Sequence, residues 1–141
     1  MSTLNDVPIL PWIKNKLGVE DDFTKFDPDI IGFINSTFME LGQLGVCDPF
    51  FQIDSDGQGT WDDLVDGYEK YGTLSGIQRY IFNKVKLSFD PPGNGFLVEQ
   101  LKKDNEELAF RLIVQSEGSM TEEEFDKYLN KKKRARSEEN N

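Results

Sequence analysis

Apolar side chains recur every three or four positions in four stretches of the chain, which is the spacing of an amphipathic α-helix. The clearest stretch follows Asp27-Pro28-Asp29, where a capping aspartate, a first-turn proline and a second acid are typical of a helix start. Its apolar positions are Ile30, Ile31, Ile34, Phe38, Leu41 and Leu44. We predict a helix here with Asp27 as its N-cap and Gly45 as its end. Phe33 and Met39 widen the apolar surface, as in a helix that is central in a bundle or shared with a neighbouring subunit.

Three further helices are predicted from the same spacing. The first covers residues 8–18 and ends at Gly18, and Trp12 is expected in the core. Another runs from residue 74 to residue 89, where Asp90-Pro91-Pro92-Gly93 stops it. The last runs from residue 95 to residue 115, with Asn94 as its cap and Asp104 as a polar exception in its apolar seam. The seam consists of Leu97, Leu101, Leu108 and Leu112, and we expect it to pack on the helices at 28–44 and 74–89.

Residues 46–72 lack helical spacing and form a long connection. Residues 50–53 are compatible with a short strand, a turn rich in aspartate and glycine follows, and residues 60–65 resemble a capped helical turn. Long connections in small domains are usually functional or disordered. The apolar residues expected to anchor an ordered loop are Phe50, Phe51, Ile53 and Trp61. Seven acidic and no basic residues lie between Asp48 and Glu69.

The predicted fold is therefore mostly α. It is a small bundle of about four to five helices with a long protruding loop, which holds at most a short strand or hairpin, and an extended C-terminal tail. Residues 1–118 form the helical domain and residues 119–141 form an extension. Thr121-Glu122-Glu123-Glu124 resembles a capping box that opens a short helix. The apolar face of this helix, Phe125, Tyr128 and Leu129, precedes a basic run of Lys131, Lys132, Lys133, Arg134 and Arg136.

The composition excludes several function classes. The 26 acidic and 16 basic residues give the 141-residue chain a net charge of −10, which argues against tight nucleic-acid binding. There is no histidine, so no Ser-His-Asp or Cys-His catalytic arrangement is possible, and the single Cys47 rules out a disulfide framework. We expect a non-enzyme without a cofactor, made in the cytoplasm, with no signal peptide and no membrane span.

Two charged segments allow alternative interpretations. Alternate oxygen-bearing residues in the loop, from Asp54 to Asp62, suggest a calcium site, but the position of the closing glutamate is occupied by Val65, so no metal site is expected. The basic tail is compatible with nucleic-acid binding, a localisation signal, a solvated end, or docking on an acidic protein surface. The aromatic face in front of the basic run favours docking.

Several segments resemble, in the same order, the head–tail connector (adaptor) proteins of long-tailed phages. They are residues 27–35 (DPDIIGFIN), 41–46 (LGQLGV), 60–63 (TWDD), 85–94 (VKLSFDPPGN) and 101–112. The resemblance covers about residues 8–115, and its sharpest part is Phe89-Asp90-Pro91-Pro92-Gly93-Asn94. Residues 116–141 extend beyond the pattern of that family.

The resemblance implies a ring, with twelve copies expected, in the virion neck between capsid and tail. The ring would bind the portal protein, extend a DNA channel without specific DNA contacts, and dock a stopper or tail-completion protein. The tail residues given above are then the candidates for portal binding. The candidates for the channel or for tail docking are Asp54, Asp56, Trp61, Asp62 and Asp63. The alternative is a small acidic cytoplasmic module that captures one protein partner through its C-terminal tail.

Overall fold

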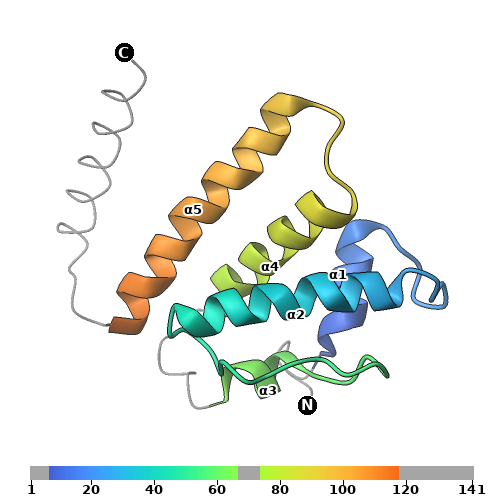
Figure 1. Cartoon of the computed structure of the whole chain (residues 1–141), viewed down its shortest axis with the longest axis horizontal. Helices are drawn as coiled ribbons and strands as arrows, with labels where there is room; N and C mark the ends of the chain where they lie inside the picture. Colours follow the sequence, from blue (N-terminus) through green and yellow to red (C-terminus); the bar gives the residue numbers. More distant parts are fainter. Residues whose placement is uncertain (1–6, 67–73, 118–141) are drawn as a thin grey trace.

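The computed structural model describes residues 7–66 and 74–117. Within these ranges it contains five helices, α1 (Ile9–Leu17), α2 (Asp27–Gln43), α3 (Trp61–Val65), α4 (Leu74–Phe89) and α5 (Gly95–Glu117) (Figure 1). No strand forms in the described part of the chain, and one isolated antiparallel bridge joins Pro8 to Thr60. The mostly α prediction is confirmed, whereas residues 50–53 form no strand.

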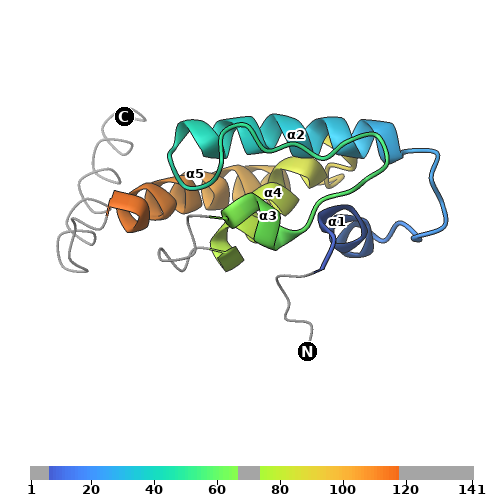
Figure 2. The same ribbon diagram turned by 90° about the horizontal axis from the view of Figure 1, so that it is seen from below.

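Helix α4 is the centre of the arrangement. Helix α2 packs on it from one side and α5 from another, and α1 adds a smaller contact. The connection that follows α2 runs back alongside α2 and then reverses to reach α3 (Figures 1 and 2). Together with α3 it is the described part of the long loop predicted at residues 46–72, and it covers one flank of the bundle; residues 67–72 lie outside the described ranges.

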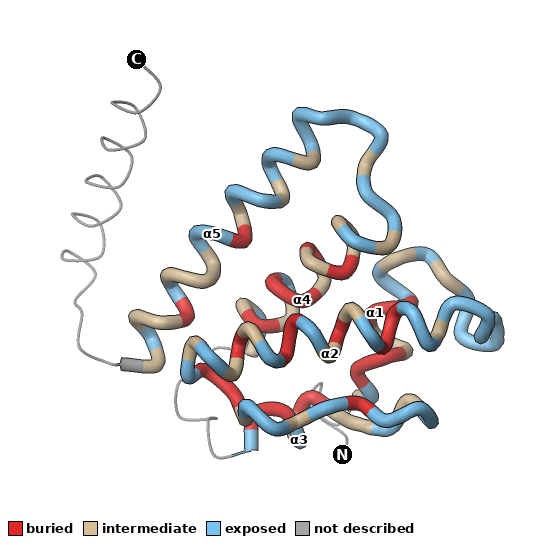
Figure 3. Tube along the Cα trace, viewed as in Figure 1, coloured by how far each residue is buried: buried red, intermediate tan, exposed pale blue. Residues whose placement is uncertain are grey.

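The core lies where α1, α2, α4 and the long loop meet (Figure 3). The predicted apolar faces of α2 and α4 supply most of it. Their fully or almost fully buried members are Ile30, Ile31, Ile34, Phe38, Leu41, Ile77, Ile81 and Val85. Helix α5 is only partly covered, and its buried positions are Asn105 and Leu112. It therefore packs mainly on α4 rather than on both α2 and α4 as expected, and Leu97 of the predicted seam is 50% exposed.

The start of α2 differs from the prediction. Phe26 occupies the N-cap position, and Asp27 is the first helical residue. The Asp27 carboxylate is used elsewhere, because its Oδ1 lies 2.9 Å from the ammonium of Lys14, which is buried in α1. Lys14 Nζ also donates hydrogen bonds to the carbonyls of Asp21 (3.0 Å) and Phe23 (2.8 Å). The prediction that Asp27 is the N-cap was therefore wrong, because its side chain forms an ion pair with a buried lysine of another helix.

The predicted end of α2 and the predicted cap of α5 are confirmed. Gly45 has a left-handed φ of 80°, and the Val46 N–H donates back to the Leu41 carbonyl (3.3 Å), which closes the end of α2. The Asn94 side chain accepts a hydrogen bond from the Phe96 N–H (2.8 Å) at the start of α5. Helix α5 continues two residues past the predicted end at 115.

Candidate docking surfaces

The long loop is clamped onto α2 at three places. Asn35 of α2 makes two hydrogen bonds with Ile53, one from the Ile53 N–H to Asn35 Oδ1 (2.8 Å) and one from Asn35 Nδ2 to the Ile53 carbonyl (3.0 Å). The rings of Phe38 and Phe51 lie 5.4 Å apart. At Gly42 the loop approaches so closely that a Cβ there would lie 2.4 Å from the Cα of Pro49. The segment from residue 49 to residue 53 is therefore held in one position against α2.

The far half of the loop is attached to α1. The Ile9 N–H donates to the Gly59 carbonyl (2.9 Å), and the Trp61 ring packs edge-on against Trp12 with 5.2 Å between centroids. Trp61 is fully buried, so its ring belongs to the core. Its place among the predicted docking residues is corrected accordingly, because it supports the loop from beneath and has no exposed surface for a partner.

The predicted loop carboxylates divide into two groups. Asp54 Oδ1 accepts hydrogen bonds from the Asp56 and Gln58 N–H groups (3.1 Å each), and Asp63 forms a capping box with Thr60, so both stabilise local backbone. Asp56 is exposed and Asp62 is partly exposed. In the described ranges no group of three or more potential metal-ligating side chains comes together.

Phe50 is the functional candidate that the sequence reasoning missed. It was expected to anchor the loop, but its side chain is 90% exposed. Its backbone is fixed, because its N–H donates to Asp48 Oδ1 (2.9 Å) and its neighbours Pro49 and Phe51 contact α2. Pro49 and Phe50 form a turn in which the Phe51 N–H donates to the Asp48 carbonyl (3.4 Å), so Phe50 lies at the corner of the turn while Phe51 packs on Phe38. The Asp48-Pro49 pair, which is typical of a turn start, was the available signal.

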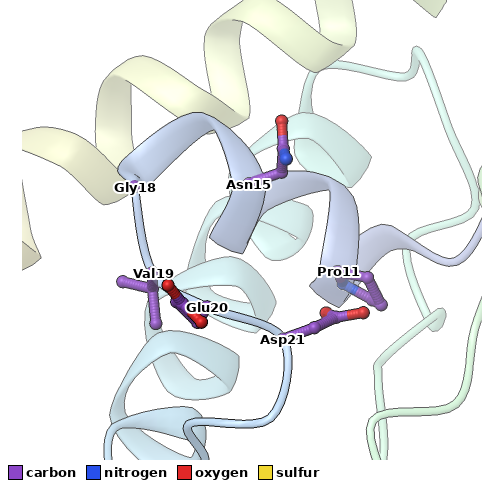
Figure 4. A pocket seen from close by; sticks show the side chains of 6 residues that line it. All are labelled: Pro11, Asn15, Gly18, Val19, Glu20 and Asp21. Carbon is purple, nitrogen blue, oxygen red and sulfur yellow. The ribbon is translucent and has the colours of Figure 1, made fainter.

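A second exposed apolar region lies at the other end of α2. The rings of Phe23, Phe26 and Phe89 form a row with 5.4 Å between successive centroids, and Phe23 and Phe26 are 45% and 37% exposed. Two hollows flank the turn that precedes them. One, of about 380 Å³, reaches Phe23 and Phe26, and the other, of about 450 Å³, has the acidic side chains of Glu20 and Asp21 on its wall (Figure 4).

A groove between α4 and α5 is the third surface feature. Its floor contains the buried Asn105, whose Nδ2 donates to the Tyr80 carbonyl (3.1 Å) and whose Oδ1 accepts from Asn83 (2.8 Å). Beside this pair, Asp104 accepts hydrogen bonds from Arg79 (2.6 Å) and Asn83 (2.7 Å). Asp104 is the polar exception in the predicted apolar seam. Through these hydrogen bonds it fixes how α5 lies on α4.

Burial raises the pKa of two ionisable side chains in the described ranges. Desolvation, followed by the nearby negative charge of Asp48, raises the pKa of Cys47 from 9.0 to about 12. Desolvation, followed by the charge and hydrogen bond of Glu40, raises the pKa of Tyr80 from 10.0 to about 12. Cys47 therefore stays a neutral thiol at physiological pH, which does not suit a nucleophile.

The predicted portal-binding residues lie outside the described residues. They are Phe125, Tyr128, Leu129, Lys131, Lys132, Lys133, Arg134 and Arg136. Among residues 7–66 and 74–117, the helices lack the length of apolar sequence that a membrane span requires.

The molecule is thus a small helical bundle whose distinguishing features are surfaces suited to contacts with other proteins. A family model described as phage connector protein matches residues 9–119, which is most of the chain. The chain belongs to the phage connector protein family, as the sequence resemblance predicted. No curated protein and no solved structure matches it.

Membership of this family defines the kind of work the chain does. A connector has a structural role in the phage particle, and it associates with other head and tail proteins in the neck of the virion. This is a non-enzymatic kind of protein. Within the described residues, the exposed aromatic and charged surfaces given above are the candidates for such associations.

Proposed function

We propose that the chain is a head–tail adaptor, which forms a ring of twelve copies between the portal protein and the stopper or tail-completion protein. The observation that carries this proposal is the connector-family match over residues 9–119. The ring extends the DNA channel of the portal, so its work is mechanical.

The charge of the chain supports a channel role. With a net charge of −10 on each chain, the ring repels the phosphate backbone, and DNA passes without being retained. The exposed Asp56 and the partly exposed Asp62 lie on the loop that we assign to the channel wall or to docking of the stopper. Asp54, Asp63 and Trp61 contribute indirectly, by shaping and supporting that loop.

The extension at residues 119–141 is proposed to attach the ring to the portal. Its apolar face and basic run suit an acidic protein surface. Removing residues 119–141 is expected to leave the helical body folded and to weaken binding to purified portal. Removing only residues 137–141, which keeps the basic run, is the matched control and should bind normally. Equal binding by both truncations would exclude the extension from attachment.

The test of the adaptor proposal is quantitative mass spectrometry of purified particles. The copy number of this chain is compared with that of the portal protein in the same sample. Equal copy numbers are expected for a twelve-subunit ring seated on a twelve-subunit portal. Absence of the chain from complete particles would overturn the proposal.

A further inference from the structure

Phe50 stands out among the exposed apolar residues because its position is fixed although its side chain is 90% exposed. A rigid aromatic side chain loses little conformational freedom on binding, which is why aromatic residues are enriched at protein interfaces. Its surroundings in the chain are strongly acidic, with Asp48, Asp54 and Asp56 nearby in sequence and no basic residue from 48 to 66. A complementary surface must offer an apolar hollow with positive charge at its edge.

The groove between α4 and α5 has this character. It has a volume of about 460 Å³, and Tyr80, Leu87 and Ala109 supply apolar surface while Lys84 and Lys102 supply positive charge. A cavity of roughly 150 Å³ already admits a benzene ring, so the groove has room for a phenylalanine side chain. Helix α4 also carries three basic and no acidic residues.

The lysines of the groove retain capacity for a further partner. Lys84 Nζ lies 3.5 Å from Glu40, and Lys102 Nζ lies 3.6 Å from Glu99. Both pairs are long and well exposed, and pairs of this kind contribute little to stability. Glu106 also lines the groove, so the two lysines set a positive edge only on part of it.

The other apolar hollow does not match Phe50. Glu20 and Asp22 line the hollow beside Phe23 and Phe26, and they would repel an acidic loop. Phe50 also leaves the groove of its own chain unfilled, since its side chain is exposed. The complementary occupant of the α4–α5 groove is therefore Phe50 of a second copy.

We propose that Phe50 of one copy inserts into the α4–α5 groove of the next copy, between Leu87 and Ala109. The anchor and the groove are different surfaces of the chain, so the contact is head-to-tail and leaves an anchor and a groove free at the two ends. Repetition of such a contact produces a closed ring when the rotation between successive copies allows it. This inference rests on the proposed ring and assigns the residues of its subunit contact.

Site-directed disulfide cross-linking tests this contact. Gln52→Cys chains, which keep Phe50, are mixed with Ser88→Cys chains, because Gln52 is exposed two positions from Phe50 and Ser88 is exposed and lines the groove. Linked peptides are identified by mass spectrometry, both in concentrated solution and in particles that incorporate the chains. The native Cys47 is buried and does not compete. Ser36→Cys replaces Gln52→Cys in the control, because Ser36 is exposed on the solvent side of α2.

A 52–88 linkage at least tenfold above the 36–88 control, in solution or in particles, is the expected result. Equal yields, or no linkage in either sample, would overturn the contact. Lys102→Glu should lower the 52–88 yield roughly fivefold, whereas Lys103→Glu, its exposed neighbour outside the groove, should not.

The two proposals fail separately. If the chain reaches parity with the portal in particles but shows no 52–88 linkage, the adaptor proposal stands and the contact is overturned. If the chain is absent from particles but the linkage forms in solution, the contact stands and the adaptor proposal is overturned.

Discussion

Replacing Gly42 of α2 by alanine tests whether the loop is held rigidly against that helix. A Cβ at residue 42 would lie 2.4 Å from the Cα and 2.8 Å from the Cβ of Pro49. Carbon atoms in ordinary contact are about 3.5–4.0 Å apart, so Pro49 must move by about 1 Å. Because the clash involves backbone rather than a flexible side-chain end, we expect the overpacking cost of about 1–3 kcal/mol to be near its upper end.

The same helix offers a matched control. Gly32 is exposed, and a Cβ there meets nothing within 4 Å. Gly32→Ala should therefore stabilise the protein by up to about 1 kcal/mol through helix propensity alone. Gly42→Ala gains the same helix propensity but adds the clash with Pro49. This variant should therefore be about 2 kcal/mol less stable than the unsubstituted protein.

The assay is urea unfolding followed by circular dichroism, with the free energy of unfolding taken from the midpoint and slope. Thermal unfolding gives a second measure of the same difference. At about 4 °C per kcal/mol for a chain of this size, the melting temperatures of the two variants should differ by roughly 10 °C. If Gly42→Ala proves as stable as Gly32→Ala, Pro49 can move freely. Phe50 would then not be held at a fixed position.

Three further predictions concern the core and its charges. Lys14→Met should cost about 3 kcal/mol in urea unfolding because it leaves the Asp27 carboxylate without its ion pair, and Lys14→Met combined with Asp27→Asn should recover part of that loss. The unfolding free energy should be unaffected by Cys47 below pH 9 and fall by about 1.4 kcal/mol per pH unit above it, because the unfolded thiol ionises while the native pKa is about 12. Cys47→Ala should remove this part of the decline in a pH series of urea midpoints. Ile34→Asp places an unpaired charge at a fully buried position and should abolish helical circular dichroism; a soluble, helical variant would contradict the core described here.

The elements of this fold were predictable wherever neighbouring residues decide them. The bounds of α4 and the cap at Asn94 follow from an apolar repeat, a proline pair and a short polar side chain, all of which act within one or two turns. The Thr60 capping box is equally local. The family was predictable for the same reason, because the resemblance rests on short runs such as residues 89–94. The match over residues 9–119 confirms it.

The candidate docking surfaces were less predictable because exposure depends on which distant segments meet. Phe50 and Phe51 are identical residues in adjacent positions, yet one is 90% exposed and the other packs on Phe38. The Asp48-Pro49 pair indicates a turn, but only the path of the loop across α2 decides which of the two rings faces outward. The same holds for Trp61, whose burial results from a contact with Trp12 almost fifty positions away.

The sequence alone determined the helical class, the positions of most helix ends and the acidic character of the long loop, because these depend on spacing, caps and composition. The tertiary structure decided how the charges and aromatic rings are used. It pairs Asp27 with the buried Lys14 instead of the start of its own helix, and it leaves Phe50 in solvent beside an acidic turn. Contacts between segments distant in the chain set these outcomes, since the energy of a buried ion pair or a ring contact depends on separation in space.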